Sequence, residues 1–297
     1  MSAPVSPNFT HIEPSHPLYR LVGPLMAGNS EVYERLHGTA FLIAPGYALT
    51  ATHVVVDYLE KIQRSNVGAQ VCKPGHHTET LTFFMFILIQ LPDGRSIPLN
   101  VHKTYGSTPG DIALLAVSRP PNIEWSEFGP YPTLRMAPPA IGTHISALGY
   151  PGSTAERQSD GIVNIRIWPR LAIGQVMEHH GERRDPLLLN FPCFRVNAKF
   201  DGGMSGAPVL DDAGAICGVV SKGYDLPEDE EPISYAACIW PAVRIGIDDL
   251  PPMANDKRRL LDLVHSNTIL VVDAHRVQGG FSEDGRFVSV LLQSSDA

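Results

Sequence analysis

Residues 201–209 have the sequence DGGMSGAPV, in which Ser205 stands among three glycines. Glycine permits backbone turns and close approaches that other residues rarely make. In such a loop, successive backbone N–H groups can converge on an anion. A strand is predicted to follow over residues 207–210. The segment is therefore expected to present a serine hydroxyl beside amide groups that can bind an anion.

Two other segments carry residues of a matching chemical kind. Residues 38–44 (GTAFLIA) and 47–50 (YALT) are typical of two strands around a Pro-Gly turn, and His53 follows them. A histidine just past a strand end can swing its imidazole into a cleft. Asp111 opens the apolar run DIALLAV, where burial lets a carboxylate hold a histidine in one tautomer. Each signal alone is weak, because a lone histidine is more often structural and an aspartate before a strand is usually a cap.

The composition indicates a compact, β-rich protein. The chain has 297 residues, a formal charge of −8, 26 glycines and 26 prolines. This length corresponds to about two domains. Glycines and prolines scattered without a repeat among apolar segments indicate many turns and short strands, and hence an all-β fold. The acidic balance argues against a dedicated nucleic-acid-binding protein.

The predicted elements divide the chain into two β-rich halves, a proline-rich connection and a tail. A helix is predicted over 54–66, and strands over 81–91 and 95–104 flank a Pro-Asp-Gly turn. The second half carries strands predicted over 143–149, 162–177, 187–197, 207–210, 215–221 and 233–239. In the tail, a helix is predicted within 254–267 and a hairpin from 268–275 and 286–293. The expected regions are a lead-in over 1–34, a first β half over 35–118, a linker over 119–140, a second β half over 141–250 and a C-terminal extension over 251–297.

Targeting and redox signals favour a cytoplasmic protein. The N-terminal residues lack a basic stretch followed by an apolar one, so no signal peptide is predicted. The most apolar stretch, residues 81–91, is much shorter than the ~20 residues of a membrane helix, so no membrane association is expected. The cysteines form no CxxC pair, which favours free buried thiols in a reducing compartment and leaves a Cys193–Cys217 disulfide as the alternative. The four cysteines are Cys72, Cys193, Cys217 and Cys238.

Two pairs of adjacent histidines, at 76–77 and 179–180, are the remaining candidates for a metal site. Adjacent histidines in polar segments flanked by glycine and proline are usually exposed loop residues. No carboxylate stands at ligand spacing from them. The sequence therefore predicts neither a metal nor a cofactor.

Together, and in the order histidine, aspartate, serine, the three segments resemble the trypsin/chymotrypsin family of serine proteases. The resemblance is closest to the cytoplasmic and bacterial-type branch, which lacks the disulfides of the secreted enzymes. Residues 147–152 (ALGYPG) strengthen it, because that branch usually opens its second barrel with such a segment. The resemblance covers residues 35–245.

The resemblance implies an all-β fold of two six-stranded antiparallel β-barrels, one in each β half. The short C-terminal helix and hairpin extension is expected from the residue pattern. The active cleft would lie between the barrels. Ser205 would attack the scissile carbonyl, His53 would take and return the proton, and Asp111 would orient His53. The backbone amides of Gly203 and Ser205 would form the oxyanion hole.

The resemblance also places a substrate-binding strand edge at Ser221-Lys222-Gly223. There the backbone would pair with an extended substrate, and the Ser221 hydroxyl would bond to the buried aspartate. An ordinary strand exit is the alternative. Two cues on specificity conflict: Phe200 at the base of the pocket would favour a small apolar residue, whereas acidic residues over 225–231 would favour arginine or lysine. A solvated acidic loop is the alternative for the second cue, and the balance leans towards non-trypsin-like specificity.

Met204 departs from the family pattern. Secreted, zymogen-activated members carry an aspartate at this position, which pairs with a newly cut N-terminal amine. A methionine cannot make that ion pair, and no Ile-Val-Gly-Gly cleavage site precedes the first β half. Activation by N-terminal clipping is therefore not expected, and a regulatory partner that orders residues 202–204 is one hypothesis.

The sequence thus predicts a serine endopeptidase that cleaves protein or peptide substrates through an acyl-enzyme intermediate. Two alternatives stay open. One is a catalytically silent module that keeps the fold and binds peptides or partners. The other is a protease subunit controlled by a partner in a larger stress or defence system. In that case the C-terminal extension would be either a docking element or a packed cover.

Overall fold

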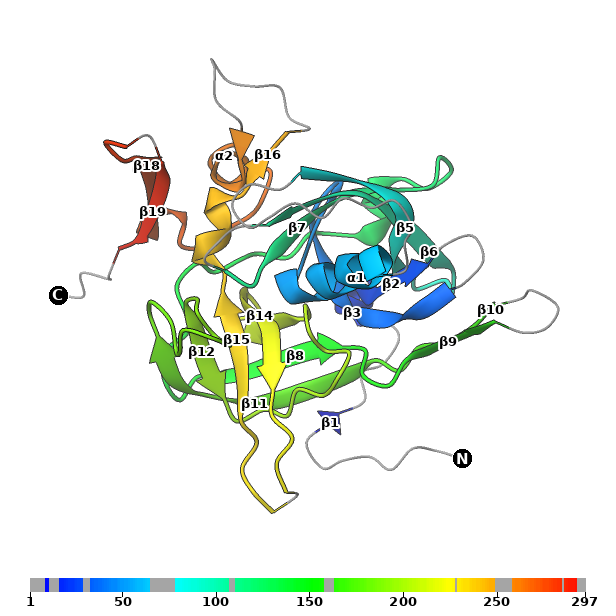
Figure 1. Cartoon of the computed structure of the whole chain (residues 1–297), viewed down its shortest axis with the longest axis horizontal. Helices are drawn as coiled ribbons and strands as arrows, with labels where there is room; N and C mark the ends of the chain where they lie inside the picture. Colours follow the sequence, from blue (N-terminus) through cyan, green and yellow to red (C-terminus); the bar gives the residue numbers. More distant parts are fainter. Residues whose placement is uncertain are drawn as a thin grey trace.

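Two β-barrels form the body of the protein, and the C-terminal extension (orange to red) packs beside them (Figure 1). A computed structural model describes residues 9–10, 16–28, 33–64, 78–106, 110–157, 163–227, 229–248, 258–284 and 286–292. The predicted all-β fold, with two six-stranded antiparallel barrels and a short helix near the C-terminus, is confirmed.

The first barrel closes in the order β2-β3-β4-β7-β6-β5, and every neighbouring pair is antiparallel. Its interior is apolar, and residues 40–44 of β3 are fully buried. The strands are β2 (Val22–Gly28), β3 (Tyr33–Ala44), β4 (Tyr47–Thr50), β5 (Thr78–Gln90), β6 (Ser96–Gly106) and β7 (Ala113–Ser118).

The barrel begins earlier than the boundary at residue 35 that the sequence indicated. Strand β2 lies within the expected lead-in over 1–34 and closes the barrel against β5. Gly23 and Pro24 conceal this strand in the sequence, because both residues usually interrupt strands. Gly23 is required by packing, since a Cβ atom there would lie 2.4 Å from the Leu88 carbonyl oxygen. The first barrel therefore begins at Val22, and Gly23 allows β2 to lie close to β5.

The helix and the hairpin expected in this half are both present. Helix α1 (Thr52–Arg64) starts two residues before the predicted helix, directly after β4. The apolar stretch at 81–91 lies almost wholly in β5, and Gly94 adopts φ +86° in the turn to β6. None of the helices in the described ranges is long and apolar enough to cross a membrane.

The second barrel has the order β11-β12-β15-β14-β13-β8 and closes through pairing of β8 with β11. A short strand, β1 (Phe9–Thr10), adds to the outer edge of β11. Its six strands are β8 (His144–Gly149), β11 (Arg170–His180), β12 (Cys193–Val196), β13 (Pro208–Asp211), β14 (Ile216–Gly223) and β15 (Ser234–Cys238).

In the second β half, one predicted strand is divided into two and another is shorter than predicted. The run over 162–177 separates into β10 (Val163–Arg166), which forms a hairpin with β9 (Thr154–Arg157), and the barrel strand β11. Pro169 lies between them and has no N–H group for a strand ladder. The strand predicted over 187–197 begins only at Cys193, because the residues before it form a turn.

The expected linker over 119–140 packs tightly against its neighbours. It contains the short 3₁₀ helix η2 (Trp125–Phe128) and the buried residues Leu134 and Met136. The Leu134 backbone bridges Ile216 of the second barrel and Val271 of the extension. The connection between the barrels is therefore part of the core.

The extension contains a short helix and a hairpin, as expected, but its first strand is displaced. The helix α2 (Leu260–His265) lies within the predicted range, whereas β18 (Val277–Phe281), not residues 268–275, pairs with β19 (Phe287–Leu291). The predicted strand instead follows Leu134, whose amide donates to Leu270 O at 2.8 Å and whose carbonyl accepts from Val272 N at 3.0 Å. The remaining elements are η1 (Pro17–Arg20), η3 (Trp240–Arg244), η4 (Ala274–Arg276) and the pair β16 (Gly246–Ile247) with β17 (Arg258–Arg259).

The extension joins the common core. Leu260, Leu263 and Ile269 belong to the same buried cluster as the first barrel. The Asp273 carboxylate is buried and accepts hydrogen bonds from the backbone amides at 136 and 137, at 2.7 and 2.9 Å. Removing the extension would therefore expose core residues and leave two amides without their acceptor.

Three of the four cysteines are free, buried thiols: Cys193, Cys217 and Cys238. The alternative Cys193–Cys217 disulfide is therefore wrong. Burial raises the pKa of Cys193 to about 12, so this thiol stays protonated. Cys72 lies outside the described residues.

Candidate active site

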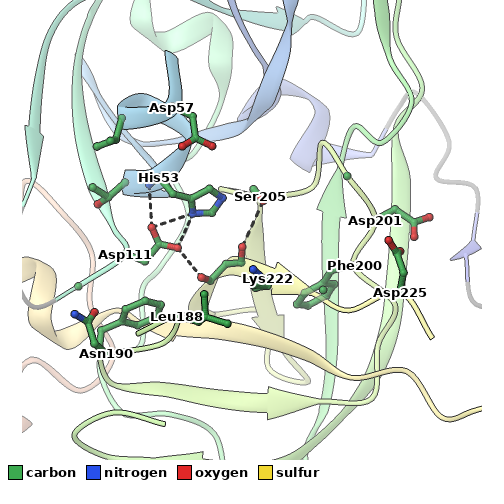
Figure 2. A pocket seen from close by; sticks show the side chains of 17 residues that line it. His53, Asp57, Asp111, Leu188, Asn190, Phe200, Asp201, Ser205, Lys222 and Asp225 are labelled. Carbon is green, nitrogen blue, oxygen red and sulfur yellow. Dashed lines mark hydrogen bonds and ion pairs between the residues drawn. The ribbon is translucent and has the colours of Figure 1, made fainter. Parts of the chain in front are cut away.

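His53 and Asp111 are joined at the start of helix α1. The imidazole Nδ1 of His53 lies 2.8 Å from Asp111 Oδ2 and 3.1 Å from Oδ1 (Figure 2). An ionised carboxylate only accepts hydrogen bonds, so Nδ1 carries the proton and Nε2 is left to face the cleft. The His53 backbone amide also donates to Asp111 Oδ1, at 3.0 Å. The first turn of a helix has amides without intrahelical partners, so this carboxylate caps α1 as well as orienting the imidazole.

Ser221, at the end of strand β14, connects the second barrel to this pair. Its hydroxyl donates to Asp111 Oδ2 at 2.5 Å. Both side chains are buried, and Asp111 is only 6% exposed. The Asp111 carboxylate therefore accepts hydrogen bonds from three groups: the His53 imidazole, the His53 backbone amide and the Ser221 hydroxyl of the other barrel. The hydrogen bond that the sequence analysis expected from Ser221 is present.

The pKa of His53 is raised above its ordinary value of 6.5. Burial of the ring lowers this pKa, but the hydrogen bond and negative charge of Asp111 raise it by more. Asp57, one helical turn along α1, raises it further, and Lys222 lowers it. The imidazole thus stands among charges that favour the imidazolium form.

Ser205 lies in a sharply turned loop at the opposite wall of the same cleft (Figure 2). Gly203 and Gly206 adopt φ +97° and +87°, which strongly favours glycine. A Cβ on Gly206 would lie 2.1 Å from the Thr39 carbonyl oxygen, and one on Gly203 would lie 2.9 Å from the Tyr150 carbonyl oxygen. Both glycines therefore serve the turn, and Gly206 also permits the close contact with the first barrel.

The Ser205 hydroxyl donates to the Ser221 carbonyl oxygen at 3.4 Å. Within the part of the chain that the structure describes, no hydrogen bond joins it to His53. The two side chains nevertheless face the same cleft (Figure 2). Rotation of the serine about its Cα–Cβ bond is the movement that would redirect the hydroxyl.

The backbone amides of Gly203 and Ser205 flank that of Met204 in the loop of the candidate nucleophile. Neither donates to an acceptor in the described ranges, whereas Met204 N between them bonds to Asp201 O at 3.0 Å. Two amides without partners beside a serine hydroxyl are available to a ligand oxygen. The role of these two amides as an oxyanion hole stays a prediction.

The cleft has a volume of about 670 Å³ and is lined by both barrels. All the residues predicted for substrate binding, Phe200, Ser221 and Gly223, line it. Gly223 has no room for a side chain, because a Cβ there would lie 2.0 Å from the Phe200 carbonyl oxygen. The other lining residues are Thr52, His53, Val56, Asp57, Gly110, Asp111, Leu188, Asn190, Phe191, Asp201, Gly202, Ser205, Lys222 and Asp225.

Several of these residues were missed by the sequence analysis. Asp57 could have been found from the helix period, because it lies four residues after His53 and hence on the same face of α1. Leu188 and Asn190 come from the turn before β12, and no local pattern places that turn at the cleft. The described part of the acidic loop contributes Asp225 alone, while Glu231 accepts a hydrogen bond from Asn197 at 3.0 Å.

Met204 is fully buried in the core of the second barrel. Its side chain packs against Gly149, where a Cβ would approach it to 2.9 Å. The position next to the candidate nucleophile is thus held by apolar packing.

Among the described residues, no group of three or more histidine, cysteine, aspartate or glutamate side chains could hold a metal ion. His179 bonds through Nε2 to the Pro139 carbonyl oxygen at 2.7 Å, and both His179 and His180 lie on strand β11 instead of in a loop. The histidines at 76–77 lie outside the described residues.

Paired β-barrels with a histidine, a carboxylate and a serine on their shared cleft are typical of serine proteases of the trypsin class. The trypsin-like peptidase domain family matches residues 38–219, which is more than half of the chain. The chain therefore belongs to that family, and it is a hydrolase that acts on peptide bonds. No match to a curated protein was found.

Solved structures with a similar fold include Deg5, at 18% identity and a TM-score of 0.48, covering 74% of this chain and 84% of that chain. The active form of the Rv3671c protease from M. tuberculosis is 18% identical with a TM-score of 0.43, covering 74% and 77%. Neuropsin, a serine protease expressed in the limbic system of mouse brain, is 16% identical with a TM-score of 0.47, covering 77% and 92%.

Proposed function

We propose that this chain is a serine endopeptidase that acts through Ser205, His53 and Asp111 and forms an acyl-enzyme. The observation that carries the proposal is the Nδ1–carboxylate pair at 2.8 Å, placed on the same cleft as a serine with two unpaired amides beside it. In a protein of the trypsin-like peptidase family, these are the parts needed for acyl transfer.

The reaction begins when the Ser205 hydroxyl turns from the Ser221 carbonyl towards His53. Its oxygen attacks the peptide carbonyl carbon, and the hydroxyl proton passes to Nε2 of His53. The carbonyl oxygen becomes an oxyanion held by the Gly203 and Ser205 amides. Asp111 keeps Nδ1 protonated and stabilises the imidazolium without taking its proton.

The C–N bond then breaks, and His53 gives the proton to the leaving amine. This step leaves an ester between Ser205 and the acyl half of the substrate. Water attacks the ester with His53 as base, and the serine hydroxyl is restored. The proposal needs no N-terminal clipping, because the buried Met204 offers no carboxylate for a new N-terminus.

The orientation of the Ser205 hydroxyl also distinguishes the two alternatives to this proposal, a catalytically silent binding module and a protease subunit controlled by a partner. A silent binding module would keep this hydroxyl on the Ser221 carbonyl. A protease controlled by a partner would release it only when the partner binds near 202–204. Labelling of the isolated chain by a fluorophosphonate separates these cases from the proposal, because labelling needs an activated serine.

The test compares the wild type with Ser205→Ala, His53→Ala and the control Ser118→Ala, whose side chain lies on the first barrel outside the cleft. In the labelled protein an Oγ–P bond forms as the P–F bond breaks and fluoride leaves. We expect mass spectrometry to find one adduct, on Ser205, in the wild type and Ser118→Ala only. An adduct that persists in Ser205→Ala, or a wild type that never reacts, would overturn the proposal. Cleavage profiling with a peptide library then identifies the substrate preference.

A further inference from the structure

Thr39, on strand β3 of the first barrel, contacts the nucleophile loop of the second barrel directly. The residue is fully buried. Its backbone amide donates to the Ser205 carbonyl oxygen at 2.8 Å. Its hydroxyl donates to the Gly203 carbonyl oxygen, also at 2.8 Å, over a sequence separation of 164 residues. One buried residue thus bonds to the carbonyls of both residues whose amides have no acceptor in the described part of the chain.

The proton positions around the Thr39 hydroxyl follow from its partners. The Tyr150 amide lies 3.2 Å from Thr39 Oγ1, and a backbone amide can only donate. The hydroxyl therefore accepts from Tyr150, and its single proton is free to go to the Gly203 carbonyl. The Thr39 carbonyl is itself held by Thr50 Oγ1 at 2.8 Å, so the clamp is anchored in its own barrel.

Holding the Gly203 carbonyl fixes the peptide plane that follows Gly203, so that only rotation about the Gly203 N–Cα bond can still turn the Gly203 amide, which belongs to the preceding plane. The carbonyls of Gly203 and Ser205 both bond to Thr39, and within the described residues their amides have no acceptor. Gly203 has no side chain to restrain it and adopts φ +97°. Met204 between them is apolar and buried in the core, so its side chain offers no polar anchor. Among the described residues, the hydrogen bond that a side chain makes to the Gly203 backbone comes from the Thr39 hydroxyl.

We propose that Thr39 is a positioning residue for the oxyanion hole, which acts across the barrel interface by holding the Gly203 carbonyl and thereby aiming the Gly203 amide at the cleft. The proposal rests on the proposed function of Ser205. It assigns to the first barrel a second task besides carrying His53 and Asp111. It also supplies a means of ordering this loop in a chain whose residue 204 is methionine.

The test uses Thr39→Val, which keeps the shape and the backbone amide but removes the hydroxyl, and Thr39→Ser, which restores it. Tyr150→Phe is the matched control. It removes another buried hydrogen bond of 2.8 Å between the barrels, from the Tyr150 hydroxyl to the Val22 carbonyl, and leaves Thr39 intact. Each variant is treated with a fluorophosphonate, whose P=O oxygen occupies the position of the oxyanion. The saturating inactivation rate and the half-saturating concentration are measured separately.

We expect Thr39→Val to lower the saturating rate about 10- to 100-fold, less than the ~100- to 1,000-fold typical of losing a donor outright. The half-saturating concentration should change little, because the loss falls on the transition state. Thr39→Ser should restore most of the rate, and Tyr150→Phe should lose thermal stability but keep the wild-type rate.

Three results would overturn the proposal while leaving the proposed function intact: a wild-type rate in Thr39→Val, an equal loss of rate in Tyr150→Phe, or no recovery in Thr39→Ser. A wild type without Ser205-dependent labelling would instead remove both proposals. If Thr39→Val does not fold, Thr39→Ala takes its place with the same expectations, because it also lacks the hydroxyl.

Discussion

In the first barrel, His53 and Asp111 are hydrogen-bonded to each other. In the second barrel, the loop of Ser205 is hydrogen-bonded to a residue of the first barrel. The imidazole and the His53 amide both bond to one buried carboxylate. The carbonyls of Gly203 and Ser205, by contrast, are bonded by a residue of the first barrel. The histidine–carboxylate pair forms within one barrel and receives one further bond, from Ser221 of the other barrel, whereas the nucleophile loop is held largely across the interface.

This difference has a physical basis. A carboxylate at the start of a helix meets unpaired amides and a favourable dipole, so Asp111 and α1 stabilise each other locally. A glycine-rich loop has no such internal order, because glycine loses more conformational freedom on folding than any other residue. Changes in the first barrel should therefore act on the chemistry directly, and changes at the interface should act through the position of the loop.

The largest effect is expected for Asp111→Asn. The amide group can no longer hold a protonated Nδ1 in the same way, so His53 is stabilised in the wrong tautomer. The expected loss is roughly 10,000-fold in kcat, the size known for this change in a protease of the same class. The control is Asp93→Asn, in the exposed turn of the β5–β6 hairpin. A loss of less than about tenfold would contradict the role given to Asp111.

A smaller effect is expected for Ser221→Ala, which removes the single side-chain bond between the second barrel and the carboxylate in the described structure. A hydrogen bond to a charged group contributes about 1.5–3 kcal/mol, so the free energy of unfolding should fall by about that amount. Activity should fall about tenfold or somewhat more, because Asp111 keeps its contacts with His53. Denaturant unfolding and labelling rates measure the two losses. Full activity would show that the first barrel holds the carboxylate alone.

The smallest effect is a shift in pH dependence. The pKa of His53 is raised above 6.5, and the reaction needs the neutral imidazole. Activity should therefore rise with pH, with the midpoint of its acid limb above pH 6.5. Asp57→Asn removes a negative charge and should move that midpoint to lower pH, whereas Lys222→Ala removes a positive charge and should move it to higher pH.

These two variants form a matched pair, since both residues line the cleft on either side of the imidazole. The measurement is kcat/KM, or the fluorophosphonate labelling rate, against pH. Shifts in the same direction for both variants would mean that His53 does not set the acid limb.

Much of the site could be predicted because its parts are local in the sequence. His53 follows a strand, Asp111 precedes one, and Ser205 lies in a glycine-rich loop, and each pattern spans at most sixteen residues. The Ser221–Asp111 bond was expected from the family resemblance. Strand β2 escaped prediction because Gly23 and Pro24 look like a turn. The run at 268–275 was given the wrong partner, because an apolar strand-like pattern does not say which backbone it will follow.

The sequence alone determined the order of the strands, the glycine turns and the three residues His53, Asp111 and Ser205. These features depend on the alternation of apolar and polar residues and on backbone freedom, which are properties of short segments. Only the tertiary structure decided the contacts that orient these side chains and the loop of Ser205, because the contacts join residues far apart in the sequence. The Thr39–Gly203 bond joins residues 164 positions apart, and the Ser221–Asp111 bond joins residues 110 apart. Such contacts arise only when two barrels pack together, because side-chain hydrogen bonds depend on distances that no local pattern encodes.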